Sequence, residues 1–243
     1  MSKVLAAIGM AAMTGIVAAA DVAPVTHEEI LVALRDPINS TGNVADAVDE
    51  ATGARGWMSS DMKPIFDTKI VGRAATALMR PVLRSDPRKY QNHLLEILDQ
   101  AEPGSILVYV MQDGLEIAAM GNLMATTAKV RGLEGAVIDG AVRDITEIRQ
   151  IGLPVWSRRV SPATSVGRMV SVDKQIPVQC GGVMVYPGDY IVADADGAVV
   201  VPQQAAAQVV ALLKAYADKE TKMVPIIEET KSMLKALERY NRY

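Results

Sequence analysis

The sequence predicts an α/β fold in which helices cover a parallel or mixed β-sheet. Between residues 105 and 157, short apolar runs bounded by turn residues alternate with segments of helical periodicity, which is the pattern of βαβ units. Of the 243 residues, 50% are hydrophobic but only 4% are aromatic, as is typical of an aliphatic core between helices and a buried sheet. We find no sequence repeats or Ser/Gly-rich linkers, so we expect one domain over residues 1–243.

Two short helices are predicted before the sheet, at the end of an N-terminal helical extension (1–39) and at the start of the core. Thr26 and Glu29 have the spacing of a capping box, which opens the first helix. Asp36-Pro37 ends that helix, and Gly53 closes the second one. The two helices are expected over residues 26–34 and 43–51.

The other elements of the core, about residues 40–202, follow from periodicity and from turn residues. The expected strands are 70–77, 105–111, 135–139 and 155–157. They are followed by β-rich structure over 178–185, 190–193 and 198–201, with tight turns at Gly181-Gly182, Pro187-Gly188 and Asp196-Gly197. The expected helices of the core are 90–101, 122–130 and 144–150. After Pro202, helices over 203–217 and 223–240 are expected to form a C-terminal extension, residues 203–243.

Composition excludes several classes of function. The formal net charge of -3 provides no basic surface for nucleic acid. Cys180 is the single cysteine, so an intrachain disulfide is impossible, which fits a reducing compartment. The two histidines, His27 and His93, lie far apart and without a nearby cysteine, which argues against a zinc site of the usual nitrogen and sulfur type.

The N-terminus allows two interpretations. Lys3 precedes an apolar run from Val4 to Ala20 that ends in three alanines, as in a secretory signal peptide with a small-residue cleavage site. The alternative is a retained apolar helix that packs on the domain or on a neighbouring subunit. The run is too short and too weakly apolar for a membrane span. We favour the retained helix and a cytoplasmic protein, with a periplasmic protein as the alternative.

Two segments follow neighbouring strands of the predicted βαβ units. Gly121, Asn122, Leu123 and Met124 begin a helix, and Gly140 to Asp144 directly follow the next strand. Ligands of open α/β sheets gather at the carboxyl ends of the parallel strands, so we expect these segments to meet there. The helix start offers free amides to a small carboxylate.

The second segment supplies two charged groups. Arg143 offers a planar fork of donors for a carboxylate or a developing enolate. Asp144 offers a hard oxygen ligand for Mg²⁺ or Mn²⁺. Together with the helix start, these groups suit the polarisation of a 2-oxo acid. A purely structural interpretation is equally open, because Asp144 and Glu147 have N-cap and N3 spacing and Arg143 can pair with a surface carboxylate.

Other reactive residues receive structural interpretations. Cys180 beside two glycines is interpreted as a small buried residue, and His27 as a surface helix residue. Lys129 lies two turns from the helix start, so we expect no Schiff base. Asp189, Asp194 and Asp196 fall in turns. Trp57 and Trp156 are expected to pack, with a neighbouring subunit's site as the alternative for Trp57.

A longer pattern resembles the RraA-like family, which includes class II 4-hydroxy-4-methyl-2-oxoglutarate and 4-carboxy-4-hydroxy-2-oxoadipate aldolases. The likeness covers about residues 40–202. It rests on these segments: Gly121-Asn122-Leu123-Met124-Ala125-Thr126-Thr127-Ala128-Lys129, Arg131-Gly132, Gly135 to Asp144, Cys180-Gly181-Gly182-Val183, Pro187-Gly188-Asp189 and Ala193 to Gly197.

The resemblance implies a swivelling β/β/α domain, assembled as homotrimers or homohexamers with active sites at subunit interfaces. It implies that the amides of Gly121 to Met124 bind the pyruvoyl part of a substrate, that Arg143 contacts it, and that Asp144 holds Mg²⁺ or Mn²⁺. The implied activity is the cleavage of 4-hydroxy-2-oxo acids to pyruvate through a metal-stabilised enolate, with oxaloacetate decarboxylation as a side activity. The aldolases usually carry Glu or Asp where this chain has Asn122.

The family also suggests a different class of function. Its namesake is a non-catalytic regulator that binds and inhibits an RNA-degrading endonuclease. Such regulators lack the metal-binding Asp, whereas this chain has Asp144 and Glu147 after Arg143, so we favour the enzyme. Some relatives have been named menaquinone methyltransferases, but Gly104, Gly114 and Gly121 are too widely spaced for a glycine-rich nucleotide loop.

Overall fold

The structure, a computed structural model, describes residues 25–240 and confirms the predicted α/β fold. Its helices are α1 (His27–Arg35), α2 (Thr41–Thr52), α3 (His93–Gln100), α4 (Asn122–Val130), α5 (Ile145–Ile151), the 3₁₀ turn η1 (Gln203–Ala205), α6 (Ala206–Thr230) and α7 (Met233–Arg239). Its strands are β1 (Lys63–Pro64), β2 (Ile70–Pro81), β3 (Ile106–Met111), β4 (Ala118–Met120), β5 (Gly135–Val142), β6 (Val155–Val160), β7 (Met169–Lys174), β8 (Val178–Cys180), β9 (Val183–Val185), β10 (Tyr190–Ala193) and β11 (Ala198–Val201).

The main sheet is mixed, with a parallel centre. Its strands follow the order β1-β6-β5-β3-β2-β10-β11, and β2, β3, β5 and β6 run parallel. The long strand β2 pairs antiparallel with β10 along its first half and with β7 along its second half. The short strand β4 runs parallel to the end of β5. The carboxyl ends of β4, β5 and β6 therefore lie at one edge of the sheet.

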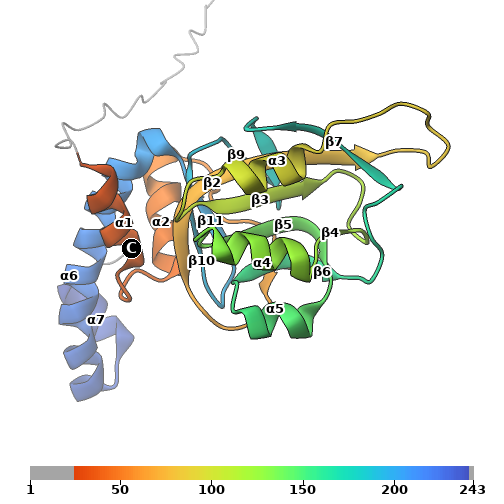
Figure 1. The fold of residues 1–243 in the computed structure, drawn as a ribbon. Coiled ribbons are helices and arrows are strands. Elements are labelled where there is room, and N and C mark those ends of the chain that lie inside the picture. Colours follow the sequence, from red (N-terminus) through yellow and green to blue (C-terminus); the bar gives the residue numbers. More distant parts are fainter. Residues whose placement is uncertain (1–24, 241–243) are drawn as a thin grey trace, which may run out of the picture.

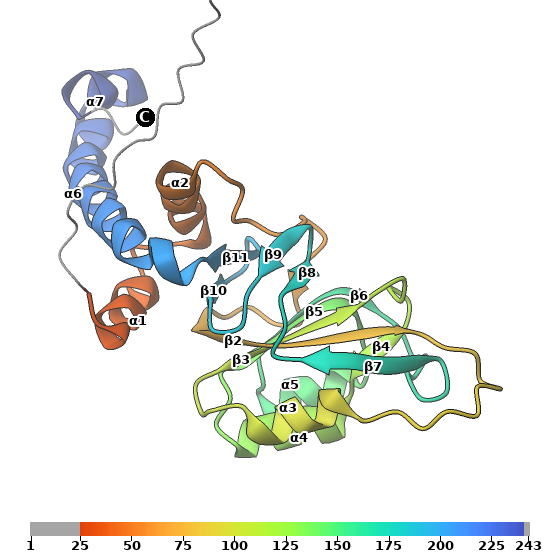
Figure 2. The same ribbon diagram turned by 90° about the horizontal axis from the view of Figure 1, so that it is seen from above.

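Helices and a hairpin cover the two faces of this sheet. Figures 1 and 2 show α3, α4 and α5 on one face, and the β8–β9 hairpin on the opposite side. The face under the helices buries one apolar cluster, which includes Leu107, Tyr109 and Ile138. The face under the hairpin buries another, which includes Trp156 and Cys180. Both faces of the central strands are covered, which explains their nearly continuous apolar sequences.

The terminal helices form a third layer beside β10 and β11. A separate apolar cluster joins α1, α2 and α6 to these strands, with Leu34, Val48 and Leu213 among its buried members. The predicted capping box is confirmed, because Thr26 Oγ1 accepts from the Glu29 amide and the Glu29 carboxylate accepts from the Thr26 amide. The apolar run from Val4 to Ala20 lies outside the described residues. Within residues 25–240, we find no helix with the length and apolar character needed to span a bilayer.

The structure corrects several predicted elements. Strands β1, β4 and β7 were not predicted, and β2 continues to Pro81 instead of ending at residue 77. The helix expected over residues 90–101 begins at His93, because Asn92 caps it by accepting from the Leu95 amide. The tight turn expected at Gly181-Gly182 is confirmed, because β8 and β9 form a hairpin that turns there.

The C-terminal helices divide at a different place from the predicted one. A break was expected over residues 218–222, but α6 runs through it and through Pro225 to Thr230. The Lys222 ammonium pairs with the Asp218 carboxylate at 2.5 Å, one helical turn away. The chain turns only at Lys231, which has a positive φ of 52°, and Ser232 then caps α7.

Candidate active site at the carboxyl edge of the sheet

The two segments singled out in the sequence lie together at the carboxyl edge of the sheet. Gly121 follows β4, and Arg143 and Asp144 follow β5, which pairs with β4. The Arg143 amide donates to the Met120 carbonyl at 3.1 Å. This bond continues the pairing of the two strands and fixes the relative position of the two loops. The prediction that these loops meet is therefore confirmed.

Asp144 joins the loops through its side chain. Its Oδ2 accepts from the Asn122 amide at 3.0 Å and lies 3.7 Å from Arg143 Nε. The residue precedes α5, but its side chain makes no capping hydrogen bond there. Glu147 is exposed and forms no capping box with it. Asp144 therefore does not cap α5 with its side chain, and its carboxylate accepts instead from the first residue of α4.

The backbone of Asp144 is held in an uncommon conformation. Its φ of 58° and ψ of 42° lie in the left-handed region, which costs a non-glycine residue about 1 kcal/mol or more. Such conformations persist where the surroundings enforce them, and they are common at functional sites. Here the conformation directs the carboxylate away from α5 and toward the start of α4.

Gly121 is required for this arrangement by close approach, because its φ of -133° is ordinary extended backbone. A Cβ on residue 121 would lie 2.5 Å from Asp144 Oδ2 and 3.0 Å from Arg143 Nε. Both distances are shorter than a van der Waals contact. The absent side chain therefore lets the carboxylate and the guanidinium approach the helix start.

The start of α4 presents amides to the same place. Gly121 has no side chain that could cap the helix, and the Asn122 amide donates to Asp144. Within the described chain, the amides of Leu123 and Met124 have no acceptor. These two N–H groups and the positive end of the helix dipole favour an anion at this position.

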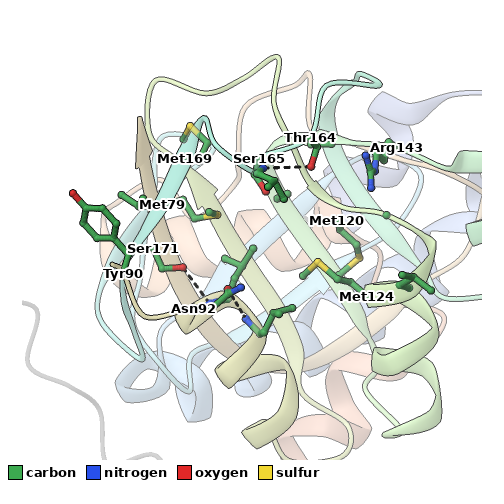
Figure 3. A pocket seen from close by; sticks show the side chains of 18 of the residues that line it. Met79, Tyr90, Asn92, Met120, Met124, Arg143, Thr164, Ser165, Met169 and Ser171 are labelled. Carbon is green, nitrogen blue, oxygen red and sulfur yellow. Dashed lines mark hydrogen bonds between the residues drawn. The ribbon is translucent and has the colours of Figure 1, made fainter. Parts of the chain in front are cut away.

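A pocket of about 390 Å³ opens beside these groups. Figure 3 shows Arg143 at one side of it and Tyr90 at the other, with Met120 and Met124 between them. Gly121, Asn122, Leu123, Met124 and Arg143 all line the pocket. Asp144 does not line the pocket itself; its side chain is 33% exposed, and its carboxylate contacts the helix start next to Arg143. The pocket size is in the range of sites for small metabolites.

The rest of the pocket lining was not found from the sequence. It is formed by the second half of β2, by β7, by the start of α3 and by the loop that precedes β7. Its lining residues include Met79, Asn92, Thr164, Ser165, Met169 and Ser171. These residues are far apart in the sequence and have no motif spacing. Tertiary contacts bring them together: β7 pairs antiparallel with β2, Thr164 bridges Ala118, and the Leu94 amide of α3 donates to Ser171.

A charged network lies on the other face of the sheet and also escaped the sequence analysis. The Asp139 carboxylate accepts from Arg158 Nη1 at 3.0 Å and from the Gly181 amide at 2.7 Å. Arg158 Nε also donates to Asp61 at 3.0 Å. These bonds connect β5 and β6 to the turn of the β8–β9 hairpin. The network therefore has a structural role and does not face the pocket.

Most of the residues that the sequence led us to interpret as structural lie outside the pocket and make packing or hydrogen-bond contacts. His27 is exposed and contacts the Tyr190 hydroxyl at 2.9 Å. Lys129 Nζ donates to the Gly152 carbonyl at 2.9 Å and does not line the pocket. Cys180 is fully buried, and burial raises the pKa of its thiol. Trp156 is buried and donates to the Asp194 carbonyl. Trp57 differs from the packing expectation, because it is 45% exposed.

The turn aspartates accept hydrogen bonds from amides of their own turns and of neighbouring segments. Asp189 is buried, and its carboxylate accepts from the amides of Tyr186 and Gln203. Asp194 accepts from the Thr41 amide and hydroxyl and from the Asp196 amide. Asp189 and Asp194 therefore anchor turns, as the sequence predicts.

The Arg143 guanidinium remains available to a ligand. Its side chain is 43% exposed, and within residues 25–240 its closest carboxylate is that of Asp144, at 3.7 Å. This separation is longer than a hydrogen bond. Arg143 is also the only residue with a full charge at neutral pH among the described residues that line the pocket. The site thus combines free amides, one guanidinium and one adjacent carboxylate.

Comparisons with known proteins identify relatives of this chain. The sequence profile of the RraA-like family, described as Aldolase/RraA, matches residues 41–200. A protein of Halalkalibacterium halodurans with the provisional name 4-hydroxy-4-methyl-2-oxoglutarate aldolase is 32% identical over 165 residues, which is 66% of this chain and 71% of the relative.

Solved structures share the fold. An uncharacterised protein from Pseudomonas syringae pv. tomato superposes with a TM-score of 0.75 at 27% identity, over 88% of this chain and 98% of that protein. Streptomyces coelicolor RraAS2, described as an unusual member of the RNase ES inhibitor RraA family, superposes with a TM-score of 0.70 at 27% identity, over 82% of this chain and 96% of that protein.

Proposed function

The chain belongs to the RraA-like family, and from this premise and the chemistry of the pocket we propose that it is a divalent-metal-dependent lyase. The reaction is the cleavage of 4-hydroxy-2-oxo acids to pyruvate, a class II aldolase reaction, with oxaloacetate decarboxylation as a side activity. The observation that carries the proposal is the contact of Asp144 with the Asn122 amide, because it holds a carboxylate next to the guanidinium and the helix start that line one pocket. The provisional aldolase name of a relative supports it.

The residues of this chain have distinct roles in the proposed reaction. The amides at the start of α4 and the Arg143 guanidinium bind the carboxylate and the 2-oxo group of the substrate. When the C3–C4 bond breaks, its electron pair moves into the three-carbon fragment and negative charge develops on the 2-oxo oxygen. Donors fixed near that oxygen stabilise the charge, and one such donor is worth about 3 kcal/mol.

Asp144 fits the cation that this reaction needs. Its Oδ1 has no hydrogen-bond donor within the described chain, and its side chain is 33% exposed. Because no group of three His, Cys, Asp or Glu side chains suited to a metal occurs among the described residues, a cage of protein ligands is not available. A single carboxylate suits Mg²⁺ or Mn²⁺, which keep several waters. The cation would supply Lewis-acid stabilisation of the enolate.

The proposed assembly is a homotrimer or a homohexamer with the site near a subunit interface. Leu123 and Val166 line the pocket although they are 77% and 79% exposed. Exposed apolar side chains gathered at one site are typical of an interaction surface. A second copy of the chain over the pocket would cover them. Light scattering of the purified protein tests this expectation.

The proposed activity is tested by pyruvate release. A panel of 4-hydroxy-2-oxo acids and oxaloacetate is incubated with the protein, with and without EDTA, and pyruvate is detected with a coupled dehydrogenase. We expect pyruvate from at least one 4-hydroxy-2-oxo acid, and we expect EDTA to abolish its release. Release that EDTA leaves unchanged contradicts the metal-dependent reaction, and release from no compound contradicts the lyase.

The alternative function is a non-catalytic regulator that binds an RNA-degrading endonuclease. The description of the Streptomyces coelicolor relative favours it. The two functions differ in metal binding, because a regulator needs no Mg²⁺ or Mn²⁺ site. Calorimetric titration with Mn²⁺ separates them: saturable binding that is lost in Asp144→Ala supports the lyase, and absence of binding supports the regulator.

A further inference from the structure

The pocket has two ends with different chemistry. One end contains Arg143 and the start of α4, as described above. The other end is formed by β2, β7 and the beginning of α3, and its walls include Met79, Leu94 and Met169, which are 6%, 3% and 7% exposed. Figure 3 shows Met79, Met169 and Ser171 on this far side, across the pocket from Arg143. A bound substrate that reaches across the pocket therefore meets a mainly apolar surface.

The far end contains no charged lining residue among those described. Its polar members are neutral groups such as Asn92 and Ser171. The side chains of these two residues already accept hydrogen bonds from amides of α3. Asn92 Oδ1 accepts from the Leu95 amide at 3.3 Å, and Ser171 Oγ accepts from the Leu94 amide at 3.4 Å. Their remaining donors are weak partners for a full negative charge.

Among the described residues no cation lines this end of the pocket, and two of the cations near it, Arg88 and Lys174, are engaged with carboxylates. Arg80 also lies near Tyr90, but it does not line the pocket. Arg88 Nε donates to Asp86 Oδ1 at 2.9 Å, and the Lys174 ammonium pairs with Glu96. Tyr90 lines the far end, and its hydroxyl donates to Asp86 Oδ2 at 2.8 Å. Burial, together with this bond, raises the pKa of Tyr90, so its hydroxyl stays neutral. A carboxylate at the far end would lose hydration without gaining an ion pair, which is unfavourable.

The apolar side chains at this end suit a tail of variable shape. Met79 and Met169 come from opposite strands of the β2–β7 pair, where Met79 is in register with Ser171. Methionine is unbranched and polarisable, and it adapts its conformation to irregular apolar groups. Met120 and Met124 extend the same kind of surface toward the helix start.

We infer that the substrate carries a single carboxylate, held at Arg143 and the start of α4, and an uncharged, mainly apolar tail that lies against the Met79–Met169 wall. This inference rests on the proposed lyase function and names the substrate class within it: 4-hydroxy-2-oxo monocarboxylates in preference to the corresponding diacids. The relative from Halalkalibacterium halodurans is named for a diacid substrate, and we expect this chain to differ from that name in its substrate preference.

The reaction of such a substrate is a balanced retro-aldol cleavage. The C3–C4 bond breaks, the C4 hydroxyl loses its proton and becomes the carbonyl of an aldehyde or ketone, and the electron pair remains on the C1–C3 fragment as the pyruvate enolate. A proton added to C3 completes pyruvate. The apolar tail leaves with the new carbonyl, so the second product is an uncharged aldehyde or ketone.

Two substrates of equal chain length test the inference. 4-Hydroxy-2-oxopentanoate ends in a methyl group and 4-hydroxy-2-oxoglutarate ends in a carboxylate, and both release pyruvate. We expect kcat/KM to be about tenfold or more higher for the methyl-terminated acid, and to rise further for the six- and seven-carbon homologues. Equal or higher kcat/KM for the diacid overturns this inference and leaves the lyase function intact. Pyruvate from neither acid overturns the proposed function and this inference with it.

A variant of the pocket wall provides a second test. Gln91 is exposed and lines the far end, so Gln91→Arg adds a cation there without disturbing the core. We expect this variant to raise the diacid to monoacid ratio of kcat/KM by about tenfold, because the new charge pairs with the second carboxylate. Gln91→Met has a similar size and no charge, and its ratio should equal that of the parent. An unchanged ratio in Gln91→Arg contradicts a tail at this end of the pocket.

Discussion

At the scale of single residues, the site depends on one residue that has no side chain and on another whose backbone is strained. Gly121 leaves room for the Asp144 carboxylate, and Asp144 holds a left-handed backbone conformation that turns this carboxylate toward α4. The sequence identified both residues from their positions after strands. The sequence could not show whether the Asp144 side chain caps α5 or contacts the start of α4, because the spacing of Asp144 and Glu147 is the same in either arrangement.

Gly121→Ala is expected to disable the site without unfolding the protein. The new Cβ would lie 2.5 Å from Asp144 Oδ2, so the carboxylate has to move away from the helix start. We expect pyruvate release to fall about 100-fold or more, with an unchanged circular dichroism spectrum. Gly42→Ala is the control, because its Cβ would meet only Ser40 Oγ at 3.5 Å. A fully active Gly121→Ala variant would contradict the assigned geometry.

Arg143→Ala is expected to remove stabilisation of the developing enolate. We expect kcat to fall by about 100- to 1,000-fold, since the lost donor acts mainly in the transition state. Arg131→Ala removes an exposed arginine that does not line the pocket, and its kcat should match that of the parent. Steady-state kinetics of both variants with the same 4-hydroxy-2-oxo acid provide the comparison. Equal kcat values in the two variants would refute the role of Arg143.

Cys180 is expected to be inert in the folded protein. Burial raises the pKa of its thiol, so the reactive thiolate is scarce at pH 8, and the sulfur is inaccessible. A colourimetric thiol reagent should label no cysteine in the native protein and one per chain in guanidinium chloride. Rapid labelling of the native protein would mean that the β8–β9 hairpin opens readily.

At the scale of elements, the sequence predicts the parallel centre of the sheet better than its surroundings. Strands β3 and β5 are apolar runs between turns, and β6 begins with one, so local signals suffice to locate them. Strand β7 has a mixed sequence from Met169 to Lys174 and owes its conformation to pairing with β2. The far wall of the pocket was missed for the same reason, because tertiary pairing and not local pattern assembles it.

The division between α6 and α7 illustrates the same limit. Proline inside a helix costs about 3 kcal/mol, and a charged segment such as residues 218–222 suggests a break. Helix α6 continues nevertheless, because Met223 and Ile226 on either side of Pro225 are buried against Ala236 of α7. Packing between elements, which the sequence does not display, outweighs the local preference.

Asp139 connects three elements, and its removal is expected to destabilise the fold. Asp139→Ala leaves Arg158 with Asp61 alone and the Gly181 amide without its acceptor. We expect the free energy of unfolding to fall by about 2 kcal/mol or more. Asp67→Ala changes an exposed carboxylate and should lie within about 0.5 kcal/mol of the parent. Urea denaturation measures both, and equal midpoints would contradict the connecting role of Asp139.

At the scale of the whole molecule, the layers place the candidate site at one edge and the terminal helices at another. The pocket lies at the carboxyl edge of the sheet, whereas α1, α2 and α6 gather beside β10 and β11 and α7 packs on the far end of α6 (Figure 2). Within the described chain, these four helices contribute no residue to the pocket. The terminal extensions therefore bear on assembly and stability more directly than on the proposed chemistry.

The most direct test of the central claim is the rate of pyruvate release by the parent protein and by Asp144→Ala, each in EDTA and again after addition of excess Mg²⁺ or Mn²⁺. Loss in EDTA and recovery with metal are predicted for the parent and for Asp67→Ala as control. Asp144→Ala should stay inactive under both conditions while its elution volume in gel filtration is unchanged. Near-parental release by Asp144→Ala, or release by the parent that EDTA does not reduce, would contradict a metal-dependent lyase centred on Asp144.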